Sequence, residues 1–133
     1  MIDVFKEMPT VTHQFVVTED VYKGFQLCSG DMNPLHTQTD FAKSKGFPEC
    51  VMYGNILNAF VSTLIGMYLP IPDVIIHSQD IQYKRPVFLN DILDAELRVD
   101  EIFESVNAVV FKFIFRNQHG QIVSKGHVQI GVI

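Results

Sequence analysis

The sequence has no tryptophan, two cysteines and few charged residues, and each scarcity narrows the class of protein. Cys28 and Cys50 show neither metal-site spacing nor a disulfide framework, so a reducing compartment is expected. The net charge of −5 argues against non-specific binding of nucleic acid. The first residues, MIDVFKEMPTVTHQF, lack the basic start and apolar run of a signal peptide. We therefore expect a cytoplasmic protein with no nucleic-acid partner.

Charged residues are also absent between Glu49 and Asp73, a stretch long enough to cross a bilayer. The stretch contains Asn55, Asn58 and Ser62, however, and the sequence that follows it is typical of soluble β-structure. We therefore expect no membrane span here, but a helix that is buried nearly all round.

Hydrophobic residues are abundant, and their spacing predicts the fold class. They make up 47% of the 133 residues, and no repeat or linker divides the chain, so we predict one domain over residues 1–133. Periodicity predicts helices over 18–28, 40–45 and 54–69, and strands over 11–17, 74–85, 92–104, 106–116 and 121–131. One long apolar helix beside antiparallel strands predicts an α+β domain with the sheet wrapped around the helix. Such a sheet leaves an exposed edge that a second copy would cover, so a homodimer is expected.

The stretch SGDMNPLH, residues 29–36, places an aspartate and a histidine in a constrained loop. Pro34 disfavours the helical region for Asn33, so the preceding helix cannot simply continue. A loop fixed in this way can aim Asp31 and His36 at one water molecule, as general acid–base catalysis requires. The ordinary alternative is that Asp31 caps a turn and His36 is a partly exposed polar residue.

The start of the long helix offers a second chemical element. Its first N–H groups have no partners within the helix and carry partial positive charge, and Gly54 would let a ligand oxygen approach them closely. Such an oxyanion donor typically contributes about 3 kcal/mol to a reaction that builds negative charge on oxygen. Alternatively, Gly54 serves only tight packing against the sheet. Asn58 and Ser62 follow on the same helix, where they are either satisfied polar groups of the core, the interpretation that we favour, or side chains that face a ligand tunnel.

Basic and metal-binding candidates are weaker. Lys43, Lys45, Lys84 and Arg85 could meet phosphate groups, although surface cations are more often only solvated. The histidines outside the loop lie at no convincing metal spacing, so no metal site is expected.

The runs FQLCSGDMNPLHTQTDFAKSKGF, VMYGNILNAF and IQYKRPVFLNDIL resemble the (R)-specific enoyl-CoA hydratases of the MaoC-like, hot-dog-fold superfamily, over roughly residues 11–131. The resemblance implies a lyase of fatty acid metabolism that hydrates trans-2-enoyl thioesters to (R)-3-hydroxyacyl thioesters, or catalyses the reverse. It implies a coenzyme A or acyl-carrier-protein thioester as substrate, no further cofactor, and a dimer with the acyl site near its interface.

The same resemblance assigns roles to individual residues. Asp31 and His36 match the pair that activates water and manages the proton at the α-carbon, and Gly54 matches the donor to the thioester oxygen. Asn33 matches a residue that supports the loop. The family usually has histidine where this chain has Tyr53, and often proline at the position of Cys50. The predicted substrate-binding residues are Asn33, Tyr53, Asn58 and Ser62.

Two other functions remain open for such a fold. A hot-dog thioesterase commonly has a carboxylate on or near the central helix, and residues 54–69 contain neither Asp nor Glu. A non-catalytic module that binds acyl thioesters would more often have lost Asp31 or His36, and both are present. The sequence predicts neither the acyl chain length, nor the carrier, nor the favoured direction of reaction.

Overall fold

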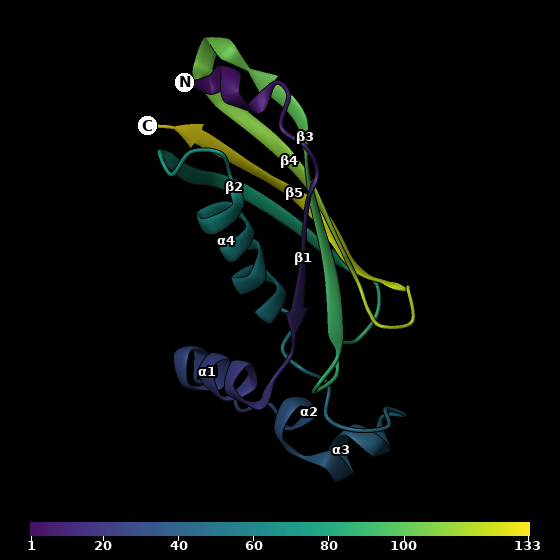
Figure 1. Ribbon diagram of the computed structural model, residues 1–133. Helices are drawn as coiled ribbons and strands as arrows, with labels where there is room; N and C mark the ends of the chain where they lie inside the picture. The colour runs from purple at the N-terminus through teal and green to yellow at the C-terminus, as the bar shows by residue number, and fades with distance from the viewer.

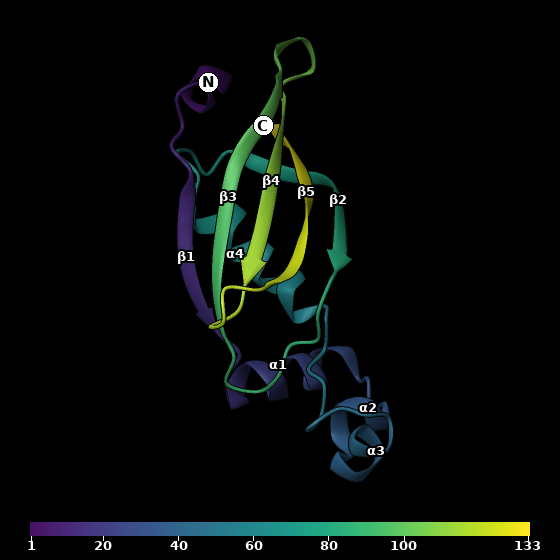
Figure 2. The same cartoon turned by 90° about the vertical axis from the view of Figure 1, so that its right-hand side faces the viewer.

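Five strands form one antiparallel sheet in the computed structural model, which describes residues 1–133 (Figures 1 and 2). The sheet order is β1-β3-β4-β5-β2, so β1 and β2 are the two edges. The strands are β1 (Val11–Val16), β2 (Val74–Tyr83), β3 (Ile92–Phe103), β4 (Ala108–Arg116) and β5 (Ile122–Val132). All five predicted strands are therefore present, and most of their boundaries move by one or two residues.

Strand β4 shows why this sequence forms a half-buried sheet. Val109, Phe111, Phe113 and Phe115 are all buried, whereas the residues between them are partly exposed. Successive side chains of a strand point to opposite faces, so this alternation places the phenyl rings on the inner face. The hairpin turn that follows closes at Gly120, which adopts φ +72° and donates its N–H to the Asn117 carbonyl at 3.0 Å.

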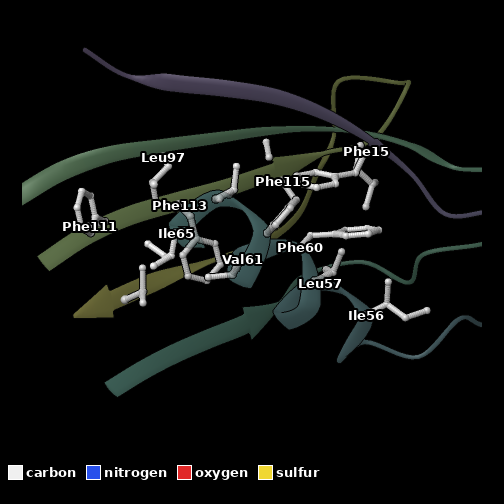
Figure 3. Packing of buried hydrophobic residues seen from close by; sticks show 14 of the residues in the cluster. Phe15, Ile56, Leu57, Phe60, Val61, Ile65, Leu97, Phe111, Phe113 and Phe115 are labelled. Atoms are coloured by element: carbon white, nitrogen blue, oxygen red, sulfur yellow. The ribbon is translucent and has the colours of Figure 1, made fainter. Parts of the chain in front are cut away.

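Helix α4 (Ile56–Tyr68) lies against the inner face of the curved sheet (Figures 1 and 3). Its Phe60 ring stacks on Phe15 of β1, with ring centroids 4.3 Å apart. The buried residues of α4 are Ile56, Leu57, Phe60, Val61, Leu64 and Ile65. This arrangement of one helix enclosed by an antiparallel sheet confirms the predicted α+β fold class.

The opposite face of α4 corrects one expectation. Ala59, Ser62 and Gly66 are exposed, so the helix is not buried all round. The sheet covers only one side of it, and small residues occupy the other side. No helix in the structure is long and apolar enough to cross a membrane.

Three shorter helices gather at the end of the sheet where α4 begins (Figures 1 and 2). These are α1 (Glu19–Ser29), α2 (Pro34–Thr37) and α3 (Thr39–Ser44), and two short 3-10 helices span Ile2–Phe5 and Glu104–Val106. Thr18 is the N-cap of α1, because its side chain accepts the Val21 N–H at 3.2 Å. Helix α2 was not predicted. Pro34 was considered only as a barrier to continuing the preceding helix, but proline is also well suited to the first position of a new one.

Candidate active site

The loop between α1 and α2 is shaped by its own side chains. Gly30 ends α1 in the left-handed region, at φ +69°, where glycine is favoured. The Asn33 N–H then donates to Asp31 Oδ1 at 2.9 Å, and the Leu35 N–H donates to Asn33 Oδ1, also at 2.9 Å. Asn33 is thereby the N-cap of α2, a structural role that explains an asparagine before Pro34. Asp31 Oδ1 therefore accepts a hydrogen bond within the turn, whereas Oδ2 makes no hydrogen bond in it.

The hydrogen bond at His36 Nδ1 determines which imidazole nitrogen is available for chemistry. His36 Nδ1 lies 2.7 Å from the Val51 carbonyl oxygen. Because a carbonyl only accepts, Nδ1 carries the proton, and Nε2 of the neutral ring has the free lone pair. His36 Nε2 lies 4.0 Å from Asp31 Oδ2. The His36 side chain is 17% exposed and the Asp31 side chain is 46% exposed. The two groups can therefore contact one shared water molecule, with His36 as the more enclosed member.

A cavity of about 300 Å³ extends from His36 to the segment before α4. His36 and Gly54 both line it, together with Val51, Met52, Tyr83, Lys84, Arg85, Pro86 and Val87. The Gly54 N–H donates to no acceptor within the chain, although the Gly54 carbonyl accepts from Leu57. Helix α4 begins at Ile56, two residues later than predicted, so Gly54 lies just before its positive end and offers a free N–H donor in a cavity that His36 also lines.

Gly54 also meets the packing role that was considered for it. A Cβ atom at this position would lie 3.0 Å from the Tyr83 ring, so glycine is what allows Tyr83 to close over the helix start. Both interpretations of Gly54 therefore apply together, and Tyr83 becomes a wall of the site. Sequence reasoning missed Tyr83, because nothing in β2 marks which of its side chains faces the cavity. Partial burial raises the pKa of the Tyr83 hydroxyl above its ordinary value.

The basic candidates divide into two groups. Lys84 and Arg85 line the cavity, and the Arg85 guanidinium donates to the Ile122 carbonyl at 2.9 Å, which orients the side chain. Lys43 and Lys45 lie on and directly after α3, and neither lines the cavity. Lys45 instead places its ammonium 5.2 Å from the centroid of the Phe41 ring.

Tyr53 lies behind the catalytic pair rather than in the cavity lining. It is only 3% exposed, and its ring packs on the imidazole of His36 with centroids 4.3 Å apart. Its hydroxyl donates a hydrogen bond to the backbone carbonyl of Asp31. Of the predicted substrate-binding residues, Tyr53 and Asn33 are therefore both placed against the loop itself.

The interpretation of Asn58 and Ser62 as core residues is wrong. Ser62 is exposed on the uncovered face of α4, and Asn58 is half-buried in a polar cluster between α4 and β2. Asn58 Nδ2 donates to Asn55 Oδ1 at 2.7 Å and lies 3.3 Å from the Tyr83 hydroxyl, while Gln79 donates to Asn58 Oδ1. The core interpretation failed because the sheet leaves this side of the helix uncovered.

Comparison with known proteins agrees with this geometry. The family described as MaoC like domain matches residues 4–113. An (R)-specific enoyl-CoA hydratase of Aeromonas caviae is 35% identical over 80 residues, which are 60% of this chain and 60% of the relative's length. Another from Rhodospirillum rubrum is 28% identical over 113 residues, or 85% of this chain and 77% of the relative. The unliganded structure of an (R)-hydratase from Pseudomonas aeruginosa has a TM-score of 0.86 at 30% identity, over 96% of this chain and 84% of the other.

Proposed function

The chain belongs to the MaoC like domain family, and on that premise we propose that it is a hydro-lyase acting on acyl thioesters. It adds water to a trans-2-enoyl thioester to give the (R)-3-hydroxyacyl thioester, or removes water in reverse. The observation that carries the proposal is the shared cavity, which is lined by His36 and by Gly54, whose N–H has no acceptor within the chain.

The proposed mechanism assigns one task to each group. The water held between Asp31 and His36 bonds through its oxygen to the β-carbon, while the pair takes up one of its protons. The pair then delivers a proton to the α-carbon, so that it returns to its starting state. Negative charge develops on the thioester oxygen between these steps, and the Gly54 N–H stabilises it by about 3 kcal/mol. No cofactor other than the thioester carrier takes part in these steps.

The carrier enters the proposal through charge. Lys84 and Arg85 line the same cavity as His36 and Gly54, where they can meet the phosphates of coenzyme A or of a carrier protein's prosthetic arm. Arg85 is tethered to the Ile122 carbonyl, so part of its ordering precedes binding.

We further propose a cytoplasmic homodimer. Strand β2 pairs only with β5, which leaves its outer edge free, and its own residues Ile75 and Ile76 are 53% and 40% exposed. A free edge with apolar neighbours is what a second copy of the chain would cover. The two free thiols, Cys28 and Cys50, suit a reducing compartment.

The first test is the loss of enoyl absorbance when crotonyl-CoA is mixed with the wild type, Asp31→Asn and His36→Ala. Each substitution is expected to lower kcat by about 10²–10⁴-fold, the usual contribution of a general acid or base. The chain provides a matched control in a second pair, because His127 Nδ1 lies 3.3 Å from Asp80 Oδ2 on the outer face of the sheet.

Substitution of that control pair, as Asp80→Asn and His127→Ala, is expected to leave the rate unchanged. Equal losses from both pairs would show that the substitutions act through folding. A wild type inactive on crotonyl-CoA, on longer enoyl-CoAs and on enoyl-carrier thioesters would refute the proposed function.

A further inference from the structure

Two tyrosines from outside the catalytic loop donate hydrogen bonds to its backbone at Asp31 and His36. The Tyr53 hydroxyl donates to the carbonyl of Asp31, and the Tyr22 hydroxyl donates to the carbonyl of His36 at 2.7 Å. Tyr22 comes from α1, and Tyr53 comes from the segment that leads into α4. The loop is therefore held from two different elements, once at each member of the pair.

A single amide connects the two hydroxyl groups. Gln26 Nε2 lies 3.3 Å from the Tyr53 hydroxyl and 3.4 Å from the Tyr22 hydroxyl. Since each hydroxyl proton points to a loop carbonyl, each hydroxyl oxygen is left as an acceptor, and a primary amide has two N–H donors. Gln26 lies one helical turn after Tyr22 on α1, so the helix itself sets the spacing.

The rings add packing to these hydrogen bonds. Tyr22 and Tyr53 are stacked with centroids 5.7 Å apart and an interplanar angle of 24°. Tyr53 also packs on the His36 ring, and Phe25 of α1 packs on Tyr53 with centroids 4.9 Å apart. These contacts enclose Tyr53 almost completely, so its ring is held in the orientation that brings its hydroxyl to the Asp31 carbonyl.

Apart from those of the tyrosines, hydrogen bonds from the segment before α4 reach the loop only at its His36 end, where the Val51 carbonyl accepts from His36 Nδ1 and the Val51 N–H donates to the Leu35 carbonyl. Asp31 and Met32 are exposed, and Met32 is 62% exposed although it is apolar. Without outside contacts, a surface loop of this kind would sample many separations of Asp31 Oδ2 and His36 Nε2. A misplacement of about 1 Å between reacting groups can lower a rate by about 10²-fold.

We infer that Tyr22, Gln26 and Tyr53 form a clamp that positions Asp31 and His36 for catalysis. The inference rests on the proposed function. The clamp residues do not line the cavity, and they act by fixing the separation of the catalytic pair. They also give the Tyr53 position, where the family usually has histidine, a defined task in this chain.

The decisive variant is Tyr53→Phe, which keeps the ring and its stacking on His36 but removes the hydroxyl. We expect kcat to fall about 10- to 100-fold, because the loss falls on the geometry of the reacting groups. KM is expected to stay unchanged, because Tyr53 does not line the cavity. The matched control is Tyr68→Phe, which removes a hydroxyl 3.3 Å from His13 Nε2 at the far end of α4. That control is expected to leave kcat unchanged.

A double-mutant cycle separates positioning from a purely structural role. If Tyr53 acts through the pair, Tyr53→Phe will lower kcat no further once Asp31 is already Asn, since residues that act as a unit are strongly non-additive. An equal fractional loss of kcat in both backgrounds would overturn the clamp.

Amide hydrogen exchange tests the clamp independently of activity. The Leu35 and His36 N–H groups are hydrogen-bonded within the loop, to Asn33 Oδ1 and the Asn33 carbonyl. We expect both amides to exchange about fivefold faster in Tyr53→Phe, and unchanged in Tyr68→Phe. Unchanged exchange in Tyr53→Phe would refute the clamp even in an active enzyme. If the wild type is inactive but the two amides exchange faster in Tyr53→Phe, the proposed function is refuted while the restraint of the loop by Tyr53 stands.

Discussion

His36 carries a structural and a chemical role on different nitrogen atoms, and substitution can separate the two. Nδ1 donates to the Val51 carbonyl at 2.7 Å, and Nε2 faces Asp31. In His36→Asn the side-chain amide nitrogen is attached to Cγ, as Nδ1 is, so it can still donate to Val51. In His36→Gln the amide lies one bond further out, toward the place of Nε2, and the Val51 carbonyl loses its partner.

The magnitudes follow from the burial of this bond. An unsatisfied buried acceptor costs about 1–3 kcal/mol, and the lower end applies here because the His36 side chain is still 17% exposed to water. For a chain of this size, about 1 kcal/mol corresponds to a decrease in Tm of about 4 °C. His36→Gln should show that decrease, whereas His36→Asn should stay within about 0.5 kcal/mol of the wild type. Both variants lose the base, so kcat should fall about 10²–10⁴-fold in each.

Differential scanning calorimetry and the crotonyl-CoA assay, on the same protein samples, measure the two roles. The expected pattern is a stable, inactive His36→Asn beside a less stable, inactive His36→Gln. Equal Tm values for the two variants would refute a stabilising hydrogen bond from protonated Nδ1 to the Val51 carbonyl. An active His36→Asn would refute Nε2 as the catalytic base.

Three further outcomes are expected. Gly126→Ala should lower the free energy of unfolding by about 2 kcal/mol in urea titration, because its Cβ would lie 2.1 Å from the Asp80 carbonyl oxygen. Gly24→Ala should instead raise the free energy of unfolding by about 0.5–1 kcal/mol, because Gly24 lies within α1 and its Cβ would meet nothing within 4 Å. Burial raises the pKa of Tyr22 above its ordinary value of 10.0. The contribution of the Tyr22 hydroxyl to the free energy of unfolding is therefore complete below pH 10.0 and is lost as the pH rises through the raised pKa. Tyr22→Phe should weaken this loss of stability at alkaline pH, as followed by tyrosinate absorbance and circular dichroism. Ile75→Lys should convert the proposed dimer to monomer in light scattering, and a wild type that is monomeric at all concentrations would contradict it.

Local rules account for much of what the sequence alone predicted. The alternation of Val109 and the β4 phenylalanines placed the inner face of that strand, because side chains in a strand alternate whatever surrounds them. The helix predicted over 18–28 is present as α1, with Thr18 as its N-cap. The position of Gly54 before an apolar run likewise predicted a helix start with free donors. Each of these depends on residues within a few positions of one another.

Contacts between distant residues decided the rest. The interpretation of Ser62 failed, because the exposure of a helix face depends on which side the sheet covers. Tyr83 and Lys84 join the cavity, and Tyr22 meets the His36 carbonyl, through approaches across the fold that no local pattern records. A side chain's chemistry is a property of the residue, but its partners follow from the packing of the whole chain. The sequence therefore determined which groups could react, and the tertiary structure decided which of them meet.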